Sequence, residues 1–263
     1  MPSTLLIIDP QIDFCCPVRG SLFVPGAEHD MQRLGRMIQR HTGEIDAIHV
    51  TLDTHHTLDI AHPMFWVDAS GKHPDPFTLI SVADAESGRW TATDPKAQSR
   101  AFEYVRALER GGRYTLCIWP YHCLIGSEGH AVKPALFETL RLWEDRYSVV
   151  NYIAKGANIF TEHYSAIRAE VPDPEDPATQ VNYPLIEALR NSERILVAGE
   201  AGSHCVANTV RDLVEHLGEG ATRLTLLTDA MSSVPGFEPV QEAFLADMLQ
   251  CRLGFATTEC AFG

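Results

Sequence analysis

The sequence has few basic side chains and no long apolar segment. Lysine and arginine together number 21 against 35 acidic residues, which gives a formal net charge of -14. A surface with this excess of negative charge repels polyanions, so we expect no nucleic acid partner. No apolar run approaches the roughly 18 residues of a membrane span, so we expect no membrane association either. The partner that this composition favours is a small molecule.

The seven cysteines show neither the spacing of a disulfide framework nor a C-x-x-C pair. Their number is odd, and two of them, Cys15 and Cys16, are adjacent. This usage is typical of a reducing compartment. The first nine residues lack the basic stretch and long apolar region of a signal peptide. We therefore expect a cytoplasmic protein.

Apolar runs of strand length alternate with amphipathic stretches of helix length along most of the chain. Most of these runs are continuously apolar, which indicates strands buried on both faces. The alternation predicts a three-layer, Rossmann-like, doubly wound α/β fold, with a mostly parallel six-stranded sheet and helices on both faces. The expected strands are 4–8, 47–52, 114–118, 149–153, 194–198 and 224–228, with a weaker one at 255–258, and the expected helices are 28–40, 95–109, 134–145, 183–191, 205–217 and 239–250.

Residues 63–94 interrupt this alternation. They contain three prolines, two glycines and the tryptophans Trp66 and Trp90, without a clear period. A segment this long is not an ordinary connection, and it is too aromatic for a disordered linker. We therefore expect one domain over residues 1–263 with an ordered excursion or lid at about 63–94, whose Trp66, Phe77 and Trp90 come near the mouth of a pocket.

Cys205 follows a buried-strand pattern and a glycine-containing turn, at the point where a helix begins. The unpaired N–H groups and the dipole of a helix N-terminus stabilise a thiolate, so we expect the pKa of Cys205 to lie below its free value of about 8.5. Cys205 is thus the best nucleophile candidate in the chain. The alternative for this segment alone is a small apolar residue that begins a buried helix.

Asp9 and Lys155 also stand where expected strands end. Because the carboxyl ends of parallel strands meet at one edge of a sheet, we expect these two side chains and Cys205 to lie together there. An ammonium group in that place would hold a thiol and a carboxyl group ionised. Taken singly, Asp9 also fits a turn cap, and Lys155 also fits a solvated surface charge.

Asp53 and His55 lie two residues apart after the second expected strand, so their side chains share a face in extended backbone. His122 follows the third expected strand. Two imidazoles and a carboxylate suit Zn²⁺, Fe²⁺ or Mn²⁺, with positions left open for water or substrate. Hydrogen-bonded loop histidines are the alternative interpretation, and His56 and His62 are additional candidate ligands.

Five segments, taken in order, resemble the motifs of the isochorismatase-like cysteine hydrolases, and specifically of their nicotinamidase branch. The resemblance spans the chain from the first expected strand past the helix at Cys205, with 63–94 as an unmatched block. The segments are Asp9-Pro-Gln-Ile-Asp-Phe14, Asp53-Thr-His55, Trp119-Pro-Tyr-His122-Cys, Ala154-Lys155-Gly156 and Gly199-Glu-Ala-Gly-Ser-His-Cys205.

The resemblance implies the isochorismatase-like hydrolase fold and a catalytic triad of Asp9, Lys155 and Cys205. It also implies a cis peptide between Glu200 and Ala201, and an oxyanion hole formed by the backbone N–H groups of Ala201 and Cys205. A homo-oligomeric assembly is a further implication.

The same resemblance assigns the metal to Asp53, His55 and His122, with zinc as the first expectation and iron or manganese as alternatives. The substrate-binding side chains that it implies are Phe14, Trp119, Gln11 and Tyr164, of which Phe14 and Trp119 would flank a flat substrate.

The implied function is that of a metal-assisted cysteine amidohydrolase, which hydrolyses a small (hetero)aromatic or related amide to a carboxylic acid and ammonia through a Cys205 thioester. Nicotinamide is the default substrate. The chain departs from the branch at Ala201-Gly202-Ser203, where nicotinamidases usually carry Ala-Thr-Asp, and in its long 63–94 segment. Isochorismatase-type ether cleavage, hydrolysis of a carbamoyl or ureido C–N bond, and an inert binding module are the alternatives; ether cleavage requires neither a thiol nor a metal.

Overall fold

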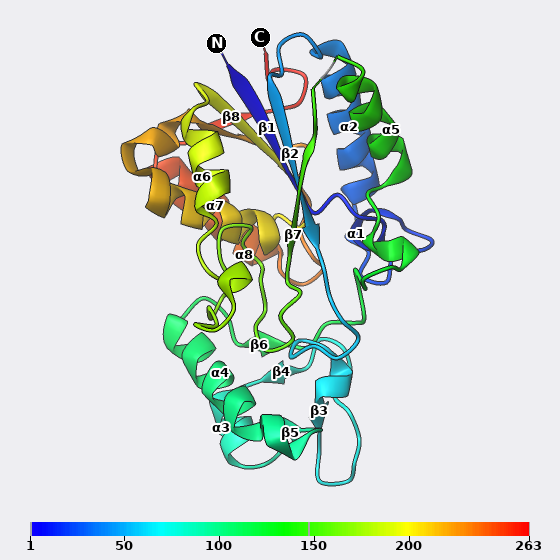
Figure 1. Ribbon diagram of the computed structural model, residues 1–263, viewed down its shortest axis with the longest axis vertical. Helices are drawn as coiled ribbons and strands as arrows, with labels where there is room; N and C mark the ends of the chain where they lie inside the picture. The colour runs from blue at the N-terminus through cyan, green and yellow to red at the C-terminus, as the bar shows by residue number, and fades with distance from the viewer. Residues whose placement is uncertain (1, 147, 263) are drawn as a thin grey trace.

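The computed structural model describes residues 2–146 and 148–262. Its main sheet has six parallel strands in the order β10-β9-β8-β1-β2-β7 (Figure 1). The predicted α/β fold with a parallel six-stranded sheet is confirmed. The strands are β1 (Ser3–Ile8), β2 (Ala47–Asp53), β7 (Asn151–Lys155), β8 (Arg194–Gly199), β9 (Leu224–Leu227) and β10 (Gly254–Ala256).

The burial of each strand follows its place in the sheet. Every residue of β1 is buried, and so is every residue of β8 after Arg194, because both strands are central and have helices on both sides. The edge strand β7 instead exposes Asn151 and Tyr152. Continuous apolar runs in the sequence thus mark the centre of the sheet.

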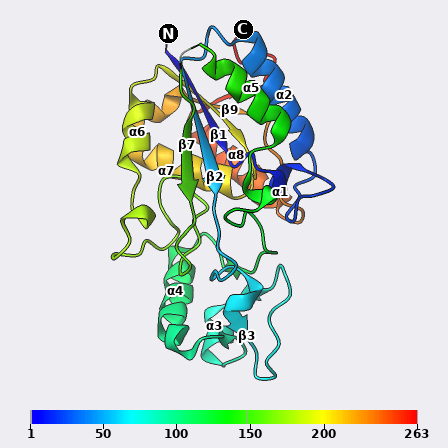
Figure 2. The ribbon, with the colours of Figure 1, turned by 45° about the vertical axis from the view of Figure 1, so that its right-hand side comes forward.

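Helices cover both faces of this sheet (Figures 1 and 2). One face carries α2 (Ala27–Arg40) and α5 (Pro134–Glu144), which pack against each other. The other face carries α6 (Tyr183–Arg190), α7 (Cys205–Leu217) and α8 (Glu238–Gln250). Within the described residues, no helix has both the length and the apolar character needed to cross a membrane.

The order of the strands places a switch point between β1 and β8. From β1 the chain builds outward through β2 to β7, and from β8 it builds in the opposite direction through β9 to β10. In open α/β sheets, the connections that leave two adjacent strands toward opposite faces open a crevice at their carboxyl ends. The short helix α1 (Ile12–Cys15) follows β1 at this crevice.

The residues between β2 and α5 form a small lobe beyond the carboxyl ends of the sheet (Figure 1). Trp66 and Trp90, which we expected near a pocket mouth, are buried within this lobe. The single domain over 1–263 stays a prediction. The lobe contains β3 (Trp66–Val67) paired with β5 (Thr91–Ala92), β4 (Leu79–Ile80) paired with β6 (Leu116–Cys117), and the helices α3 (Val82–Glu86) and α4 (Gln98–Gly111).

Two predicted elements belong to this lobe and not to the main sheet. The strand expected at 114–118 is β6, which pairs with β4 in an antiparallel ladder, and the helix expected at 95–109 is α4, which packs against α3 and β6. The sixth strand of the sheet is β10, close to the weaker strand expected at 255–258. Apolar periodicity reports that a segment is buried, but it does not report which layer buries it.

Candidate active site

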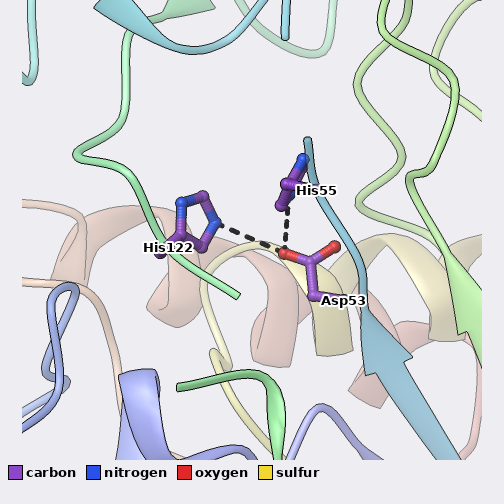
Figure 3. A group of neighbouring side chains, drawn as sticks. All are labelled: Asp53, His55 and His122. Atoms are coloured by element: carbon purple, nitrogen blue, oxygen red, sulfur yellow. Dashed lines mark hydrogen bonds and ion pairs between the residues drawn. The ribbon is translucent and has the colours of Figure 1, made fainter. Parts of the chain in front are cut away.

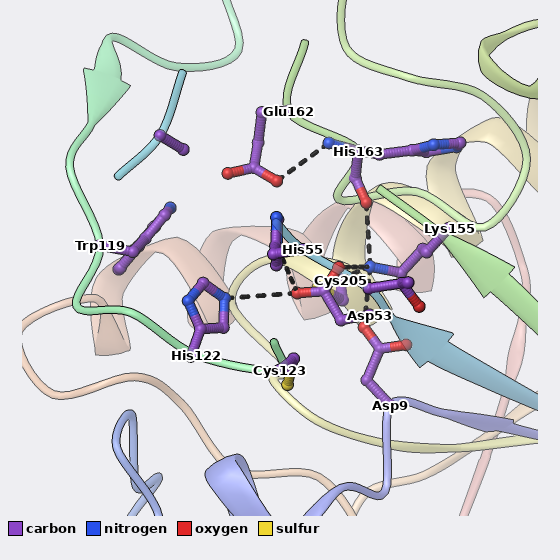
Figure 4. A network of polar contacts seen from close by, with 12 residues as sticks. Asp9, Asp53, His55, Trp119, His122, Cys123, Lys155, Glu162, His163 and Cys205 are labelled. Carbon is purple, nitrogen blue, oxygen red and sulfur yellow. Dashed lines mark hydrogen bonds and ion pairs between the residues drawn. The ribbon is translucent and has the colours of Figure 1, made fainter. Parts of the chain in front are cut away.

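Three side chains from three strand ends meet at the switch point (Figure 4). Asp9 follows β1, Lys155 ends β7, and Cys205 begins α7 after β8. The Lys155 Nζ lies 2.9 Å from Asp9 Oδ2 and 3.6 Å from Cys205 Sγ. All three side chains are buried. The structure therefore brings together the predicted acid, ammonium group and thiol, and their catalytic roles are taken up below as a proposal.

Thr51, on the neighbouring strand β2, fixes the position of Asp9. The Thr51 hydroxyl donates to the Asp9 carboxylate and accepts the Asp9 backbone N–H at 3.0 Å. Asp9 has a φ of 44°, in the left-handed region that a residue with a side chain rarely adopts. The two bonds to Thr51 hold the residue there with its carboxylate beside Lys155.

Lys155 is surrounded by acceptors. Its Nζ lies 2.9 Å from Asp53 Oδ1 and donates to the His163 carbonyl oxygen at 2.9 Å. Burial opposes its charge, but Asp53 and Asp9 outweigh that effect and hold the pKa of Lys155 well above its usual value. Burial raises the pKa of Asp9 against the opposing charge of Lys155. Lys155 therefore stays a cation, and Asp9 is a stronger base than a surface aspartate.

The thiol of Cys205 departs from the sequence expectation. Its pKa is raised well above the usual value, because burial outweighs the nearby Lys155 and because Asp9 and Asp53 add negative charge. The helix N-terminus alone predicted a shift in the other direction, and the sequence does not report how deeply the sulfur is buried. At rest the thiol is protonated, and Asp9, which is hydrogen-bonded to it, is placed to take the proton.

Asp53, His55 and His122 bring three potential ligand atoms within 4.8 Å of one another (Figure 3). Asp53 Oδ2 lies 3.1 Å from His55 Nε2 and 3.4 Å from His122 Nε2. Asp53 ends β2, whereas His122 comes from the lobe after β6. Because Asp53 Oδ1 contacts Lys155, one carboxylate joins this group to the catalytic candidates.

The hydrogen bonds around this trio suit a cation. His55 Nδ1 lies 3.0 Å from Asp59 Oδ2, and His122 Nδ1 lies 2.8 Å from the Pro120 carbonyl oxygen. Each of these acceptors requires a hydrogen on Nδ1, which leaves both Nε2 lone pairs facing Asp53 Oδ2. Two imidazole nitrogens and a carboxylate oxygen are ligands for Zn²⁺, Fe²⁺ or Mn²⁺. Burial opposes a charge on His55, yet Asp53 and Asp59 hold its pKa well above the usual value, so this place attracts positive charge.

Three other predicted residues lie outside the catalytic group and outside the Asp53, His55 and His122 trio. Gln11 donates from its amide nitrogen to the Asp53 carbonyl oxygen and accepts the Asp53 N–H, both at 2.7 Å. Both ends of its amide are thus used to position Asp53, and its role in substrate binding stays a prediction. His56 is exposed, and the His62 ring lies beside the trio, 5.1 Å from that of His55.

Aromatic rings close the site. The Trp119 indole N–H donates to the Tyr164 hydroxyl at 3.0 Å, and the Phe14 ring lies 5.5 Å from that of His122. Phe77 of the lobe lies 5.9 Å from Trp119. Cys205 is itself buried, with 6% of its surface exposed.

The turn before Cys205 leaves two backbone donors free. The Glu200-Ala201 peptide is cis, as predicted. In the part of the chain that the structure describes, neither the Ala201 N–H nor the Cys205 N–H has a hydrogen-bond acceptor. Two unused donors beside a nucleophile are what an oxyanion hole requires.

Sequence reasoning missed Thr51, Asp59, Glu162 and His204. Thr51 is a polar residue within an apolar run, and Asp59 lies four residues after a candidate ligand, so each carried a weak signal. Nothing in the sequence marked Glu162, whose buried Oε2 has no partner and whose pKa is raised to about 7 by burial. Figure 4 shows Glu162 close to His55.

Solved structures share this fold. The yeast nicotinamidase aligns with 97% of this chain and 99% of its own, at 18% identity and a TM-score of 0.67. A Pyrococcus horikoshii pyrazinamidase in complex with zinc aligns with 98% and 99%, at 18% identity and a TM-score of 0.57. An isochorismatase-like hydrolase from Alkaliphilus metalliredigens aligns with 98% and 96%, at 15% identity and a TM-score of 0.55. The chain thus has the fold of these hydrolases, as predicted. No protein-family model and no curated protein sequence matches it.

Proposed function

We propose that this protein is a metal-assisted cysteine amidohydrolase that converts a small (hetero)aromatic or related primary amide to a carboxylic acid and ammonia. The observation that carries the proposal is the position of the Lys155 ammonium group, 2.9 Å from Asp9 and Asp53 and 3.6 Å from the Cys205 sulfur. One buried cation links a base, a nucleophile and a candidate metal ligand. The fold shared with nicotinamidases and pyrazinamidases supports this reaction class.

In the first half of the reaction, Asp9 takes the thiol proton as the Cys205 sulfur attacks the carbonyl carbon. A C–S bond forms and the C=O electron pair moves to the oxygen, which then accepts hydrogen bonds from the backbone N–H groups of Ala201 and Cys205. Each such donor contributes on the order of 10²-fold or more in rate. The C–N bond then breaks, and the nitrogen takes the proton from Asp9 and leaves as ammonia.

In the second half, water attacks the thioester carbonyl while Asp9 removes a proton from the water. The C–S bond breaks, the carboxylic acid leaves, and the proton on Asp9 returns to Cys205. Lys155 keeps its charge throughout and offsets the negative charge that moves between the carboxylate and the sulfur.

Asp53, His55 and His122 would hold the divalent metal. The zinc-bound pyrazinamidase supports zinc, while the donor set also accepts iron or manganese. A bound metal would supply a positive charge that orients a polar atom of the substrate. Asp59 and the Pro120 carbonyl fix the two imidazoles in the orientation that this requires.

Phe14, Trp119 and Tyr164 would bind the acyl part of the substrate. Their flat, buried rings favour a flat and largely apolar group. Nicotinamide and its ring analogues are therefore the first substrates to assay, in line with the named activities of the structural relatives.

We also propose that residues 1–263 act as one hydrolase domain, because the alignment with yeast nicotinamidase covers nearly all of both chains. All seven cysteines are free, which fits a reducing compartment and supports a cytoplasmic location. Homo-oligomerisation stays a prediction.

Ammonia release from a panel of primary amides, nicotinamide first, tests the function. We expect hydrolysis by the zinc-loaded protein, its abolition in Cys205→Ala, and its retention in Cys123→Ala. Cys123 is equally buried, but its sulfur has no role in the proposed reaction, which makes it a matched control. Full activity in a folded Cys205→Ala variant would refute the assignment.

A further inference from the structure

His204, directly before Cys205, lies within an aromatic cluster of four rings. The ring centroids of Tyr114, Trp119, Tyr164 and Phe237 lie between 4.7 and 5.3 Å from its own. Trp119 and Tyr164 are also the rings proposed to bind the acyl group. The imidazole therefore packs against two of the rings proposed to bind the acyl group.

The hydrogen bonds of Ser203 assign the tautomer of His204. Ser203 Oγ accepts the Val234 N–H at 3.2 Å and lies 2.9 Å from His204 Nδ1. Ser203 is buried, so its own hydrogen also needs an acceptor, and Nδ1 provides one. The proton of the neutral imidazole then resides on Nε2. Burial lowers the pKa of His204 to about 3, so the ring is neutral near pH 7.

The Nε2–H group of His204 has no acceptor in residues 2–146 and 148–262. The His204 Nε2 atom is not closed to solvent. In this it differs from the Nε2 atoms of His163 and His216, which are buried and have no hydrogen-bond partner. The polar groups of two neighbouring rings are already used, since Trp119 donates to Tyr164 and Tyr114 donates to the Ser203 carbonyl. His204 thus presents an unused donor beside the acyl site.

We propose that His204 is a specificity-determining residue whose Nε2–H donates a hydrogen bond to an acceptor atom on the acyl part of the amide. The inference rests on the proposed function. An acyl group without such an atom would leave this donor unpaired, which reduces its relative kcat/KM by about tenfold or more.

The substrate class follows from the separate positions of the candidate metal ligands and of the His204 N–H donor. The ring neighbours of His55 and His122 are Phe14 and His62, whereas those of His204 belong to the cluster around Trp119. A flat acyl group can therefore present one acceptor toward the metal ligands and a second toward His204. The site favours a heteroaromatic amide with two ring acceptors over one of the same size with a single acceptor.

Four amides of nearly equal size test this preference: pyridine-3-carboxamide, with one ring nitrogen, and the pyrazine, pyrimidine and pyridazine carboxamides, with two at different spacings. In the wild-type protein, we expect the best diazine amide to exceed the pyridine amide in kcat/KM. This ratio should fall about tenfold or more in His204→Phe and be partly restored in His204→Gln, which keeps an N–H donor. Tyr114→Phe is the matched control within the same cluster and should keep the ratio. His204→Met, which also lacks a donor, replaces the Phe variant if that variant does not fold.

The outcomes separate this inference from the proposed function. An unchanged ratio in an active His204→Phe protein overturns the role of His204 and leaves the amidohydrolase standing. Absence of ammonia release from every amide by the wild-type protein overturns the function. In that event, recognition can still be tested by calorimetry, which measures the affinities of the four amides for Cys205→Ala with and without His204→Phe. An equal ratio of diazine to pyridine amide affinity in the two proteins would overturn the role of His204.

Discussion

One ammonium group sets the charge state of the site. Lys155 contacts the carboxylates of Asp9 and Asp53, and these contacts outweigh burial and keep Lys155 positive. The Cys205 thiol, in contrast, is protonated at rest. Thiolates are the species that oxidise and alkylate, so a protonated and buried sulfur is protected until, in the proposed reaction, Asp9 removes its proton.

Asp9→Asn should therefore lower the pKa of Cys205 while it abolishes hydrolysis. The carboxylate and its hydrogen bond both raise the pKa of the thiol, so their removal lets the thiolate form at a lower pH beside Lys155. Thiolate absorbance near 240 nm, titrated against Cys205→Ala in the same metal state, measures this pKa. A wild-type thiolate that is already present at pH 6 and disappears in Asp9→Asn would contradict the account.

For single residues, the sequence predicted which side chains meet at the site, but not the partners that position them. Asp9, Lys155 and Cys205 were predictable because each follows an apolar strand. The bonds from Thr51 to Asp9 and from Asp59 to His55 were not, since they depend on register and loop geometry. The direction of the Cys205 pKa shift was wrong because the dipole argument took no account of burial.

Among the elements, the lobe completes the site that the sheet begins. His122 and Trp119 follow β6 in the lobe, whereas Asp53 ends β2 in the main sheet. The His122 imidazole faces Asp53 Oδ2 across this junction. A metal held by both would tie the lobe to the sheet.

Zinc should consequently stabilise the protein and slow amide hydrogen exchange in the segment that follows β6. Zinc at about 100 times its dissociation constant adds about 2.7 kcal/mol to the free energy of unfolding. The rise in melting temperature should be lost in His122→Ala and kept in His56→Ala, since His56 is exposed and lies outside the trio. Equal zinc stabilisation of both variants would show that the ion binds elsewhere.

The elements were more predictable than their assembly. The expected strand at 114–118 and the helix at 95–109 exist, but they pack within the lobe, where the strand pairs with β4 and the helix contacts α3. Strand length also misled the prediction, because β10 spans only Gly254–Ala256 and yet completes the sheet. Local patterns do not encode such long-range choices.

In the molecule as a whole, which has a formal net charge of -14, some acidic side chains are buried. The Glu170 Oε1 atom is buried and has no hydrogen-bond partner. It lies close to an ion pair between Arg113 of the lobe and Asp212 of α7, whose charged atoms are 2.9 Å apart. Burial raises the pKa of Glu170 to about 7. The protonated side chain therefore stabilises the folded protein. This contribution is lost as the pH rises from the pKa that Glu170 has in the unfolded chain to above 7.

Glu170→Gln removes this dependence on pH. Between about pH 5.5 and about pH 8, the wild-type protein should lose about 1 to 2 kcal/mol of unfolding free energy that the variant does not lose. Urea denaturation at the two pH values measures the difference, and Glu242→Gln, at an exposed glutamate, is the control. An identical pH dependence in the wild type and in Glu170→Gln would refute the role of this side chain.

The most direct test of the central claim is mass spectrometry of the zinc-loaded protein, quenched in acid during turnover of nicotinamide or a better amide from the panel. We expect a mass increase equal to the acyl group less the thiol hydrogen that it replaces, carried by the peptide that contains Cys205 and absent in Cys205→Ala. Turnover without any adduct on that peptide, undiminished in Cys205→Ala, would contradict it.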